Sequence, residues 1–195
     1  IHMVTPKRFW REGTIYHVTT RGNRKEDIFN DKSDYKVYLA MIEENLKYYS
    51  QFNYKLLEYC LMKNHVHLLI KTDTCPLSDF MRRLNSKYTL YYNKKYNYVG
   101  HLFQGRYYSQ IIENNAQLLE VSRYIHLNPV RSKICNNPKD YIWSSYHNYI
   151  INKESKLISP EVILDFFVNR RRYREFVEHV PGVKEFDRNE WTGNI

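Results

Sequence analysis

Cysteine is scarce in this sequence, with three residues in 195. Cys60, Cys75 and Cys135 lie far apart and form no C-x-x-C pair, so a zinc site built on cysteine is not expected. Their spacing favours a reducing compartment, with the cysteines packed as small core residues. No stretch approaches the roughly 20 apolar residues of a membrane span, and the basic first thirteen residues lack the apolar centre of a secretory signal. We therefore expect a cytoplasmic protein with no membrane partner.

Acidic residues are also few, and their shortage defines the charge of the chain. The sequence has 21 Asp and Glu against 30 Lys and Arg, which gives a net charge of +9, and it has 19 tyrosines beside 9 phenylalanines and 3 tryptophans. Cationic side chains and abundant aromatic rings suit single-stranded nucleic acid, whose phosphates and unpaired bases they can bind. A basic protein whose tyrosines face the core would have the same composition, and basic charge also suits membrane surfaces and acidic proteins.

The spacing of apolar and aromatic residues predicts four strands and three helices before residue 130. The strands are expected at 14–20, 54–62, 65–71 and 106–112. The helices are expected to begin at a Ser33-Asp34 cap, at Pro76, and at Asn114 or Asn115. Pro129 is expected to stop the third helix at about Asn128, because proline has no N–H to donate and restricts the residue before it.

The order of these elements indicates the fold class. Strand–helix–strand–strand–helix–strand, followed by a helix, is typical of the α+β, ferredoxin-like split β-α-β fold, an antiparallel sheet with helices on one face. The composition changes after Pro138, and a helix start at Ser159-Pro160 precedes a basic segment. We therefore expect one domain over residues 1–150 and a helical C-terminal tail over residues 151–195, for which the sequence indicates no role.

His65 and His67 are the first residues that suggest chemistry. Side chains two apart on a strand point to the same face, so both imidazoles project together. Such a pair supplies two of the three ligands of a facial metal site. A hydrogen-bonded pair of structural histidines would give the same pattern.

Tyr124 and Asn128 form a second candidate pair. They are four residues apart in the third expected helix and therefore share a face, whereas His126 points elsewhere and is not expected to act as a base. A phenol and an amide oxygen on one face could supply a nucleophile and a third metal ligand. Alternatively, Tyr124 packs by its ring, and Asn128 caps the helix end before Pro129.

Together the two pairs resemble a known family. Residues 62–69, Met-Lys-Asn-His-Val-His-Leu-Leu, and residues 123–131, Arg-Tyr-Ile-His-Leu-Asn-Pro-Val-Arg, closely resemble the IS200-like transposases. The nearer branch is the REP-associated tyrosine transposases, which are single-tyrosine HUH (His-hydrophobic-His) nucleases. The resemblance spans about residues 8–150, with Trp-Ser-Ser-Tyr at 143–146 as a further landmark. Lys63 stands where the family commonly has proline, which affects the turn and not the chemistry.

This resemblance implies a DNA transposase that acts on single-stranded or hairpin DNA and can be a homodimer. His65, His67 and Asn128 would bind a divalent ion, Mg²⁺ or Mn²⁺. Tyr124 would attack a scissile phosphodiester, giving a 5′-phosphotyrosine and a free 3′-OH. A later 3′-OH would reverse this step, so that strands are exchanged in a DNA recombination reaction.

Basic and aromatic residues close to these motifs in the sequence are the candidate DNA contacts. They are Arg21, Arg24, Arg82, Arg83, Lys87, Arg106, Tyr107 and Arg131. Each could equally be a solvated surface residue.

Two other classes of function remain open at this stage. A non-catalytic protein that binds single-stranded nucleic acid would explain the charge and the tyrosines, but it leaves the histidine pair and the Tyr124 helix unexplained. A metal-dependent hydrolytic nuclease would use a metal-bound water and is typically built on paired carboxylates. The sequence has no D-x-D or D-x-E motif near His65, and Glu58 is the one nearby carboxylate.

Overall fold

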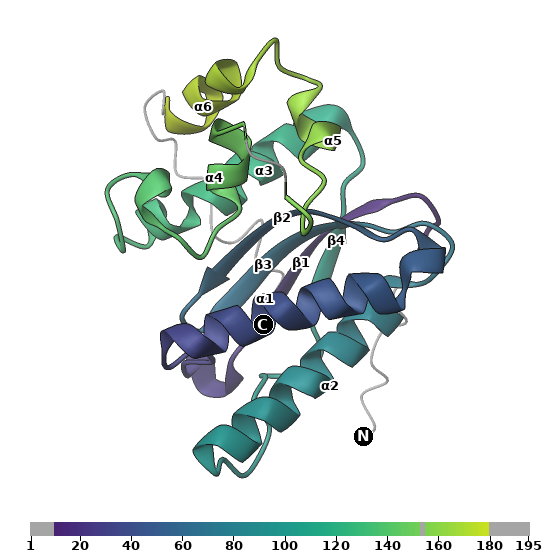
Figure 1. The fold of residues 1–195 in the computed structure, drawn as a ribbon, viewed down its shortest axis with the longest axis vertical. Helices are drawn as coiled ribbons and strands as arrows, with labels where there is room; N and C mark the ends of the chain where they lie inside the picture. Colours follow the sequence, from purple (N-terminus) through teal and green to yellow (C-terminus); the bar gives the residue numbers. More distant parts are fainter. Residues whose placement is uncertain (1–9, 153–154, 180–195) are drawn as a thin grey trace, which may run out of the picture.

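The computed structural model describes residues 10–152 and 155–179. The elements in chain order are β1 (Ile15–Arg21), α1 (Lys32–Tyr48), β2 (Lys55–Met62), β3 (His65–Lys71), α2 (Leu77–Tyr96), β4 (Tyr108–Ile111), α3 (Asn115–Arg131), α4 (Tyr146–Ile150), α5 (Glu161–Leu164) and α6 (Arg170–Glu178). The predicted order of strands and helices is confirmed (Figure 1). The fourth strand is shorter than expected, so 106 and 107 precede it.

The four strands form one antiparallel sheet in the order β2-β3-β1-β4. This order is that of the predicted split β-α-β fold, in which β1 and β3 become central neighbours. The register pairs Thr19 with His67 and Arg21 with His65. The carboxyl end of β1 therefore lies beside the histidine motif at the start of β3.

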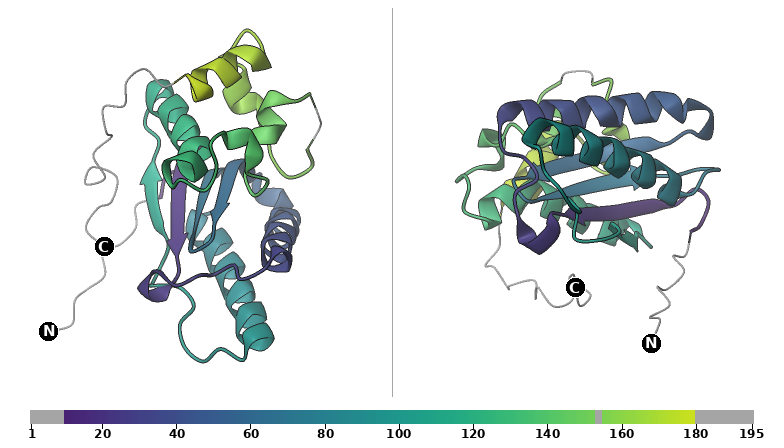
Figure 2. Two further views of the ribbon diagram at one scale, coloured as in Figure 1. Left: turned by 90° about the vertical axis from the view of Figure 1, so that its left-hand side faces the viewer. Right: turned by 90° about the horizontal axis from the view of Figure 1, so that it is seen from below.

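The helices α1 and α2 lie side by side on one face of the sheet (Figure 2). Asn85 of α2 donates a hydrogen bond to Thr20 at 3.3 Å, which identifies the face that these helices cover. Thr20 pairs with Val66 in the register, and His67 is the next residue along β3. Because successive strand residues point to opposite faces, His67 faces away from α1 and α2.

Aromatic rings fill the layer between this pair of helices and the sheet. The rings of Tyr38 and Tyr88 meet edge to face at 4.8 Å, and Phe29 stacks on Tyr35 at 4.3 Å. The buried hydroxyl of Tyr88 donates to the Ile28 carbonyl at 2.6 Å. Buried hydroxyls need such partners, so many tyrosines of this chain belong to the core and not to a nucleic-acid surface.

The start of α1 differs from the predicted cap at Ser33-Asp34. Asp31 caps the helix, and its carboxylate accepts from the backbone N–H groups of Ser33 at 2.7 Å and Asp34 at 3.2 Å. The Asp34 carboxylate accepts in return from the Asp31 N–H at 3.1 Å. This reciprocal capping box satisfies helix-end donors from both sides, which explains why the helix begins earlier, at Lys32.

The predicted end of α3 is wrong, because the helix continues through Pro129 to Arg131. Proline removes one helical bond, the one its N–H would donate to the carbonyl of Ile125. The following turn still closes, since the Ser132 N–H donates to the Asn128 carbonyl at 2.9 Å. Asn128 therefore lies inside the last turns of α3 and is not its end.

The segment after α3 covers the outer edge of β2. The Leu61 N–H donates to the Trp143 carbonyl at 2.9 Å, and the Ser145 N–H donates to the Tyr59 carbonyl at 3.0 Å. The family-like segment at 143–146 thus acts as a short extra strand against β2, with Cys60 and Ser144 as the bridged pair.

The C-terminal helices α4, α5 and α6 gather around α3 (Figure 1). Tyr173 and Val177 of α6 are buried in the same core as the strands. The described part of the tail therefore shares its core with the residues before it, and a boundary at residue 150 stays a prediction.

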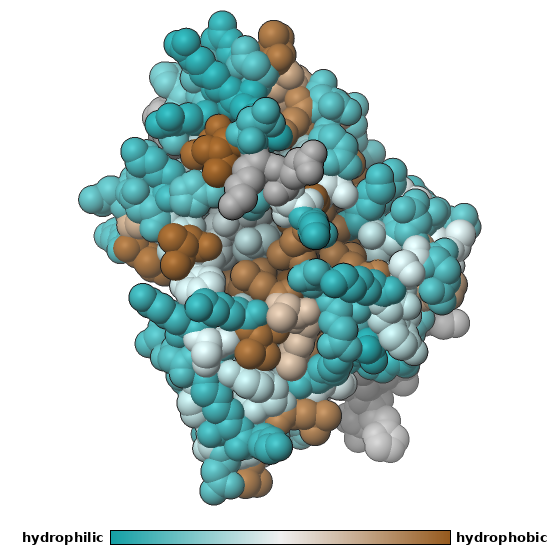
Figure 3. Space-filling view, viewed as in Figure 1, coloured by the Kyte–Doolittle hydropathy of each residue, from teal (hydrophilic) through white to brown (hydrophobic). Residues whose placement is uncertain are grey.

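None of the described helices combines the length and apolarity that crossing a bilayer requires. The face seen in Figure 3 is largely hydrophilic, with one broad apolar patch near the centre of the view and smaller ones toward its rim.

Candidate active site

His65 and His67 lie at the start of β3, on the sheet face that α1 and α2 leave open. Their ring centroids are 5.0 Å apart and the rings meet nearly at right angles. His67 is buried, while His65 is partly exposed. The strand therefore presents two adjacent imidazoles at one place, one of them reachable from solvent.

Asn64 sets the proton position on His65. The Asn64 Nδ2 donates to the Lys25 carbonyl at 3.0 Å, so its Oδ1 is the atom 2.7 Å from His65 Nδ1. An amide oxygen only accepts, so His65 Nδ1 carries the proton and its Nε2 keeps a lone pair. Lys25 and its neighbour Arg24 both have positive φ, at 63° and 51°, which brings the Lys25 carbonyl to this position.

His17 of β1 is a member of this site that the sequence did not reveal. Its Nε2 lies 3.0 Å from His67 Nδ1, and the two rings stack at 5.3 Å. The Thr19 hydroxyl also lies 3.3 Å from His67 Nδ1. Such a partner behind an imidazole fixes its tautomer and orientation. The predicted fold pairs β1 with β3, which indicates that a β1 side chain lies near His67. The register that selects His17 cannot be derived from the sequence.

Burial keeps these imidazoles neutral. Desolvation lowers the pKa of His17 to about 4 and that of His65 to about 4, with the Arg21 charge also lowering the latter. The pKa of His67 lies well below its usual value, again through burial first and then through the neighbouring His65. At pH 7 all three rings are therefore uncharged, and one nitrogen of each ring carries a lone pair.

Helix α3 brings Tyr124 and Asn128 against the histidines, on one helix face as predicted. The Tyr124 ring meets His67 edge to face at 5.5 Å and His17 at 5.9 Å. The Asn128 Nδ2 lies 3.1 Å from His67 Nε2. An amide N–H only donates, so His67 Nε2 accepts here and its proton sits on Nδ1, toward His17. The residues singled out by the two sequence motifs thus meet at one site.

Two of the candidate cations lie at this site. Arg21 ends β1, directly opposite His65 in the register. The Arg131 guanidinium lies 5.3 Å above the Tyr124 ring, and burial lowers the pKa of Arg131. Both place positive charge beside the phenol and the imidazoles.

The candidates on α2 lie elsewhere. Arg82 pairs with Asp79, and both Arg83 and Lys87 pair with Glu44 of α1. These cations belong to the helix layer on the opposite face of the sheet from Tyr124. The sequence placed them on an exposed helix side but could not show which sheet face that helix covers.

The remaining candidates precede or follow the strands. Arg24 is exposed in the loop after β1, and Arg106 is exposed in the loop before β4. Tyr107 is buried, at 7% exposure, so its ring is not presented to solvent. Its neighbour Tyr108, at 38% exposure, is the more accessible ring.

His126 and Glu58 lie on the other side of α3 from the site. Both side chains are fully buried, and His126 contacts Tyr173 and Ser145, away from the His65 pair. The expectation that His126 faces elsewhere is therefore confirmed. Glu58 accepts from Ser122 and does not reach the histidines of the site.

Within residues 10–152 and 155–179, no three His, Cys, Asp or Glu side chains are grouped so that they could hold a metal ion. A metal at this site would depend on two imidazoles, the Asn128 amide and ligands from outside the protein. This neutral donor set suits ions that accept imidazole nitrogen and amide oxygen together.

Comparison with known proteins places the chain in a family. The family described as "Transposase IS200 like" matches residues 11–128, which is more than half of the chain and includes every residue of the site from His17 to Asn128. No curated protein matches the sequence.

Among solved structures, a REP-associated tyrosine transposase bound to a REP hairpin superposes with a TM-score of 0.65 at 16% identity, covering 80% of this chain and 92% of that one. A candidate transposase from Deinococcus radiodurans has a TM-score of 0.40 at 16% identity, covering 63% of this chain and 95% of that one. The tRNA(His) guanylyltransferase of Saccharomyces cerevisiae has a TM-score of 0.47 at 10% identity, covering 90% and 76%. The first superposition supports the α+β fold, and the family match shows that this chain belongs to the IS200-like transposases.

Proposed function

We propose that this protein cleaves and rejoins single-stranded DNA, with Tyr124 as the nucleophile. The observation that carries the proposal is the meeting of two distant motifs: α3 holds Tyr124 5.5 Å from the His67 ring and Asn128 3.1 Å from the same imidazole. Structural histidines would need no phenol and no amide arranged around them. Membership of the family suggests the class of reaction, and the arrangement of Tyr124, His67 and Asn128 suggests the role of each residue.

The reaction exchanges one phosphodiester for another. The Tyr124 oxygen bonds to the scissile phosphorus as the bond from phosphorus to the 3′ oxygen breaks, and the leaving oxygen takes up a proton as a 3′-OH. The 5′ phosphate stays on the tyrosine, so the energy of the ester bond is kept. Attack by another 3′-OH reverses the step and joins two strands. The Arg131 guanidinium, 5.3 Å from the centroid of the Tyr124 ring, brings positive charge to the place where the scissile phosphate would lie.

We further propose that His65, His67 and Asn128 bind Mg²⁺ or Mn²⁺. Both imidazoles are neutral, and the contacts of Asn64 and Asn128 leave each Nε2 with its lone pair. Rotating the Asn128 amide by half a turn presents Oδ1 in place of Nδ2. A bound divalent ion would neutralise charge on the scissile phosphate and orient it for in-line attack. Phosphate oxygens would complete the shell, because none of the described residues brings a carboxylate to this site.

The DNA is expected to lie along the open face of the sheet. Arg21, Arg131 and the exposed Arg24 are the cations closest to the two motifs, and we propose them as phosphate contacts. Arg106 and Tyr108 could extend this path at the other side of β1, through β4. The similar solved structure is bound to a REP hairpin, and we propose hairpin DNA as the substrate form for this chain.

A covalent-adduct experiment tests the proposal. Labelled DNA is incubated with the protein and Mn²⁺ as a hairpin with a single-stranded flank, as a plain single strand and as a blunt duplex. We expect a denaturation-resistant adduct with the first two forms, because a scissile phosphate must bend into the site and a stiff duplex resists bending. Binding without adduct would instead support a non-catalytic nucleic-acid-binding protein. Cleavage with a free 5′ phosphate and no adduct would support a hydrolytic nuclease.

A further inference from the structure

Helix α3 has polar side chains on two opposite faces. Tyr124 and Asn128 point to the site, while Ser122 and His126 are buried on the other face. At 3.6 residues per turn the two pairs are displaced by about 200° around the helix axis. Whatever holds Ser122 and His126 therefore also sets the direction in which Tyr124 points.

The rear face of α3 is held by a chain of buried hydrogen bonds. Ser122 bonds to the Glu58 carboxyl of β2 and lies 2.8 Å from the Tyr173 hydroxyl of α6. The Tyr173 hydroxyl lies 2.6 Å from His126 Nδ1, and His126 Nε2 lies 2.9 Å from the Ser145 hydroxyl. The chain runs without a gap from Glu58 to Ser145, and both α3 residues are bonded to Tyr173.

Ser122 and His126 each have one polar neighbour on either side, and the Tyr173 hydroxyl between them also lies 3.4 Å from Glu58 Oε1. Each hydroxyl or imidazole can donate to one neighbour and accept from another along this chain. Burial raises the pKa of Glu58 to about 8 and lowers that of His126 to about 3. Buried networks of this kind favour a single arrangement, because each broken bond leaves a further polar group unpaired.

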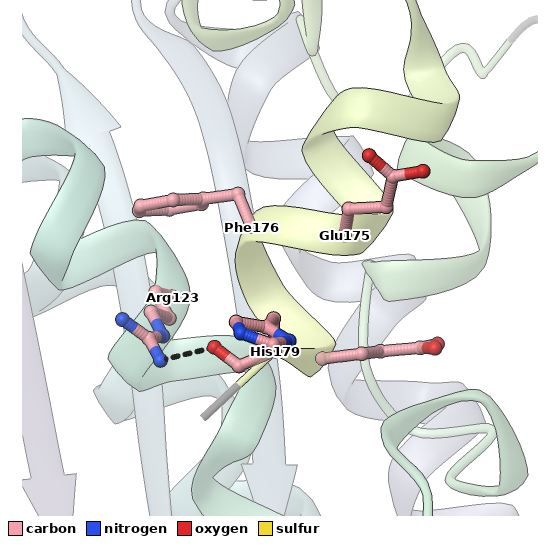
Figure 4. A pocket seen from close by; sticks show the side chains of 5 residues that line it. Arg123, Glu175, Phe176 and His179 are labelled. Atoms are coloured by element: carbon pink, nitrogen blue, oxygen red, sulfur yellow. Dashed lines mark hydrogen bonds between the residues drawn. The ribbon is translucent and has the colours of Figure 1, made fainter. Parts of the chain in front are cut away.

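A second contact from α6 reaches the residue before Tyr124. Figure 4 shows Arg123 beside Phe176 and His179, in a pocket that Glu175 and Glu178 also line. The Arg123 Nη2 donates to the His179 carbonyl at 2.8 Å, and its guanidinium lies 5.5 Å from the Phe176 ring centroid. Helix α6 therefore contacts α3 both behind and beside the tyrosine.

We propose that α6 is a clamp that fixes the rotation of α3 about its axis, with Tyr173 as a positioning residue for Tyr124 and Asn128. The inference depends on the proposed roles of those two residues. It assigns a task to the C-terminal tail, which contains none of the family-like motifs. Reacting groups misplaced by about 1 Å can lose on the order of a hundredfold in rate, so the setting of α3 is a determinant of activity.

The test compares Tyr173→Phe with Tyr149→Phe. Both tyrosines are buried, and their rings lie 4.8 Å apart, but the Tyr149 hydroxyl donates to the Leu57 carbonyl at 2.9 Å and not to an α3 side chain. Each change removes one buried hydroxyl and keeps the ring, and the melting temperature of each variant measures its cost in stability. We expect Tyr173→Phe to slow single-turnover adduct formation on the order of tenfold with unchanged DNA affinity, and Tyr149→Phe to leave the rate near wild type.

Mn²⁺ affinity without DNA, measured by electron paramagnetic resonance, separates the clamp from the proposed reaction. Tyr173→Phe should weaken Mn²⁺ binding roughly tenfold, because Asn128 moves with α3, and Tyr149→Phe should not. If wild type binds Mn²⁺ and forms no adduct, the nucleophile proposal fails while the clamp is still decided by this comparison.

A milder variant keeps the test valid if Tyr173→Phe fails to fold. Ser122→Ala removes one link from the α3 side and keeps a good helix former, so we expect the same two effects at smaller size. Equal losses in Tyr173→Phe and Tyr149→Phe, in proportion to their melting temperatures, would show that the chain only stabilises the fold. Unchanged rate and Mn²⁺ affinity in Tyr173→Phe and Ser122→Ala would also overturn the clamp.

Discussion

One face of the sheet packs under α1 and α2 through rings and aliphatic side chains, whereas the other places His17, His65 and His67 beneath α3. Both faces use the same strands, because side chains alternate along β1 and β3. Val66 and His67 are neighbours in sequence, yet one packs in the helix layer and the other meets Tyr124. We call the face under α1 and α2 the helix face and the face under α3 the site face. Burial on the helix face stabilises the fold, which allows the site face to hold neutral polar groups at some cost in stability.

The largest expected effect comes from Tyr124→Phe on the site face. The change removes only the hydroxyl, so we expect no covalent adduct, with DNA affinity and stability close to wild type. Denaturing gels with labelled DNA measure the adduct, and chemical unfolding measures stability. An undiminished adduct would move the nucleophile to another tyrosine, with Tyr107 or Tyr108 as the next candidates.

His67→Ala should reduce cleavage almost as far, and EDTA should do the same to wild type. The His67 ring meets the Tyr124 ring edge to face, and its Nε2 lies 3.1 Å from the Asn128 amide nitrogen, so the change removes a proposed ligand from the site. Asn128→Ala should be milder, because water can replace a neutral amide ligand. Full cleavage by wild type in EDTA would contradict the proposed metal role.

Leu84→Ala tests the opposite face. Leu84 is fully buried on α2, so its truncation should lower the free energy of unfolding by about 2–5 kcal/mol. At a temperature well below the unfolding transition, the adduct rate should remain near wild type. A rate that falls with Leu84→Ala while the protein is fully folded would mean that the two faces are not independent.

A pH series should measure how much the neutral buried histidines reduce the free energy of unfolding at low pH. The pKa of His17 and that of His65 are both lowered to about 4, and that of His126 to about 3, so the unfolded chain binds more protons than the folded one below about pH 6.5. Stability should therefore fall as pH drops from 6.5 toward 4, by up to roughly 1.4 kcal/mol per pH unit for each histidine. Urea unfolding at pH 7, 6 and 5 measures this slope, and His17→Asn should make it shallower. Glu58, whose pKa is raised to about 8, opposes this trend but offsets only one of the three histidines, so a flat profile would contradict their neutral state in the folded protein.

The smallest effect is expected from single arginines. Arg131→Ala should weaken single-stranded DNA binding several-fold and reduce the salt slope by about 0.7, the contribution of one phosphate contact. Arg82→Ala, on the helix face, is the matched control and should change neither. Equal losses from both would place DNA on the helix layer as well.

The sequence predicted the order of elements and the two motifs because both depend on local spacing. Alternation on a strand placed His65 and His67 together, and a helical repeat did the same for Tyr124 and Asn128. The meeting of these pairs was implied only by the family resemblance. His17 and Asn64 were missed because their roles depend on register and on a carbonyl in a left-handed turn.

Other differences between the expectations and the structure have similar causes. Pro129 was expected to end α3, but the loss of one hydrogen bond does not outweigh the packing of the last turn. The cations of α2 were included because charge is visible in a sequence and sheet faces are not. Tyr107 was included for its ring, although burial depends on the loop before β4.

The strand-like segment at 143–146 also limits how copies of this protein could assemble. Exposed sheet edges are the places where a second chain adds strands. On the β2 side, Leu61 and Ser145 already take part in backbone bonds across that edge. In the part of the chain that the structure describes, β4 pairs with β1 and with no other strand. A dimer that extends this sheet would therefore have to form at β4, whose four residues allow only a short and weakly held seam.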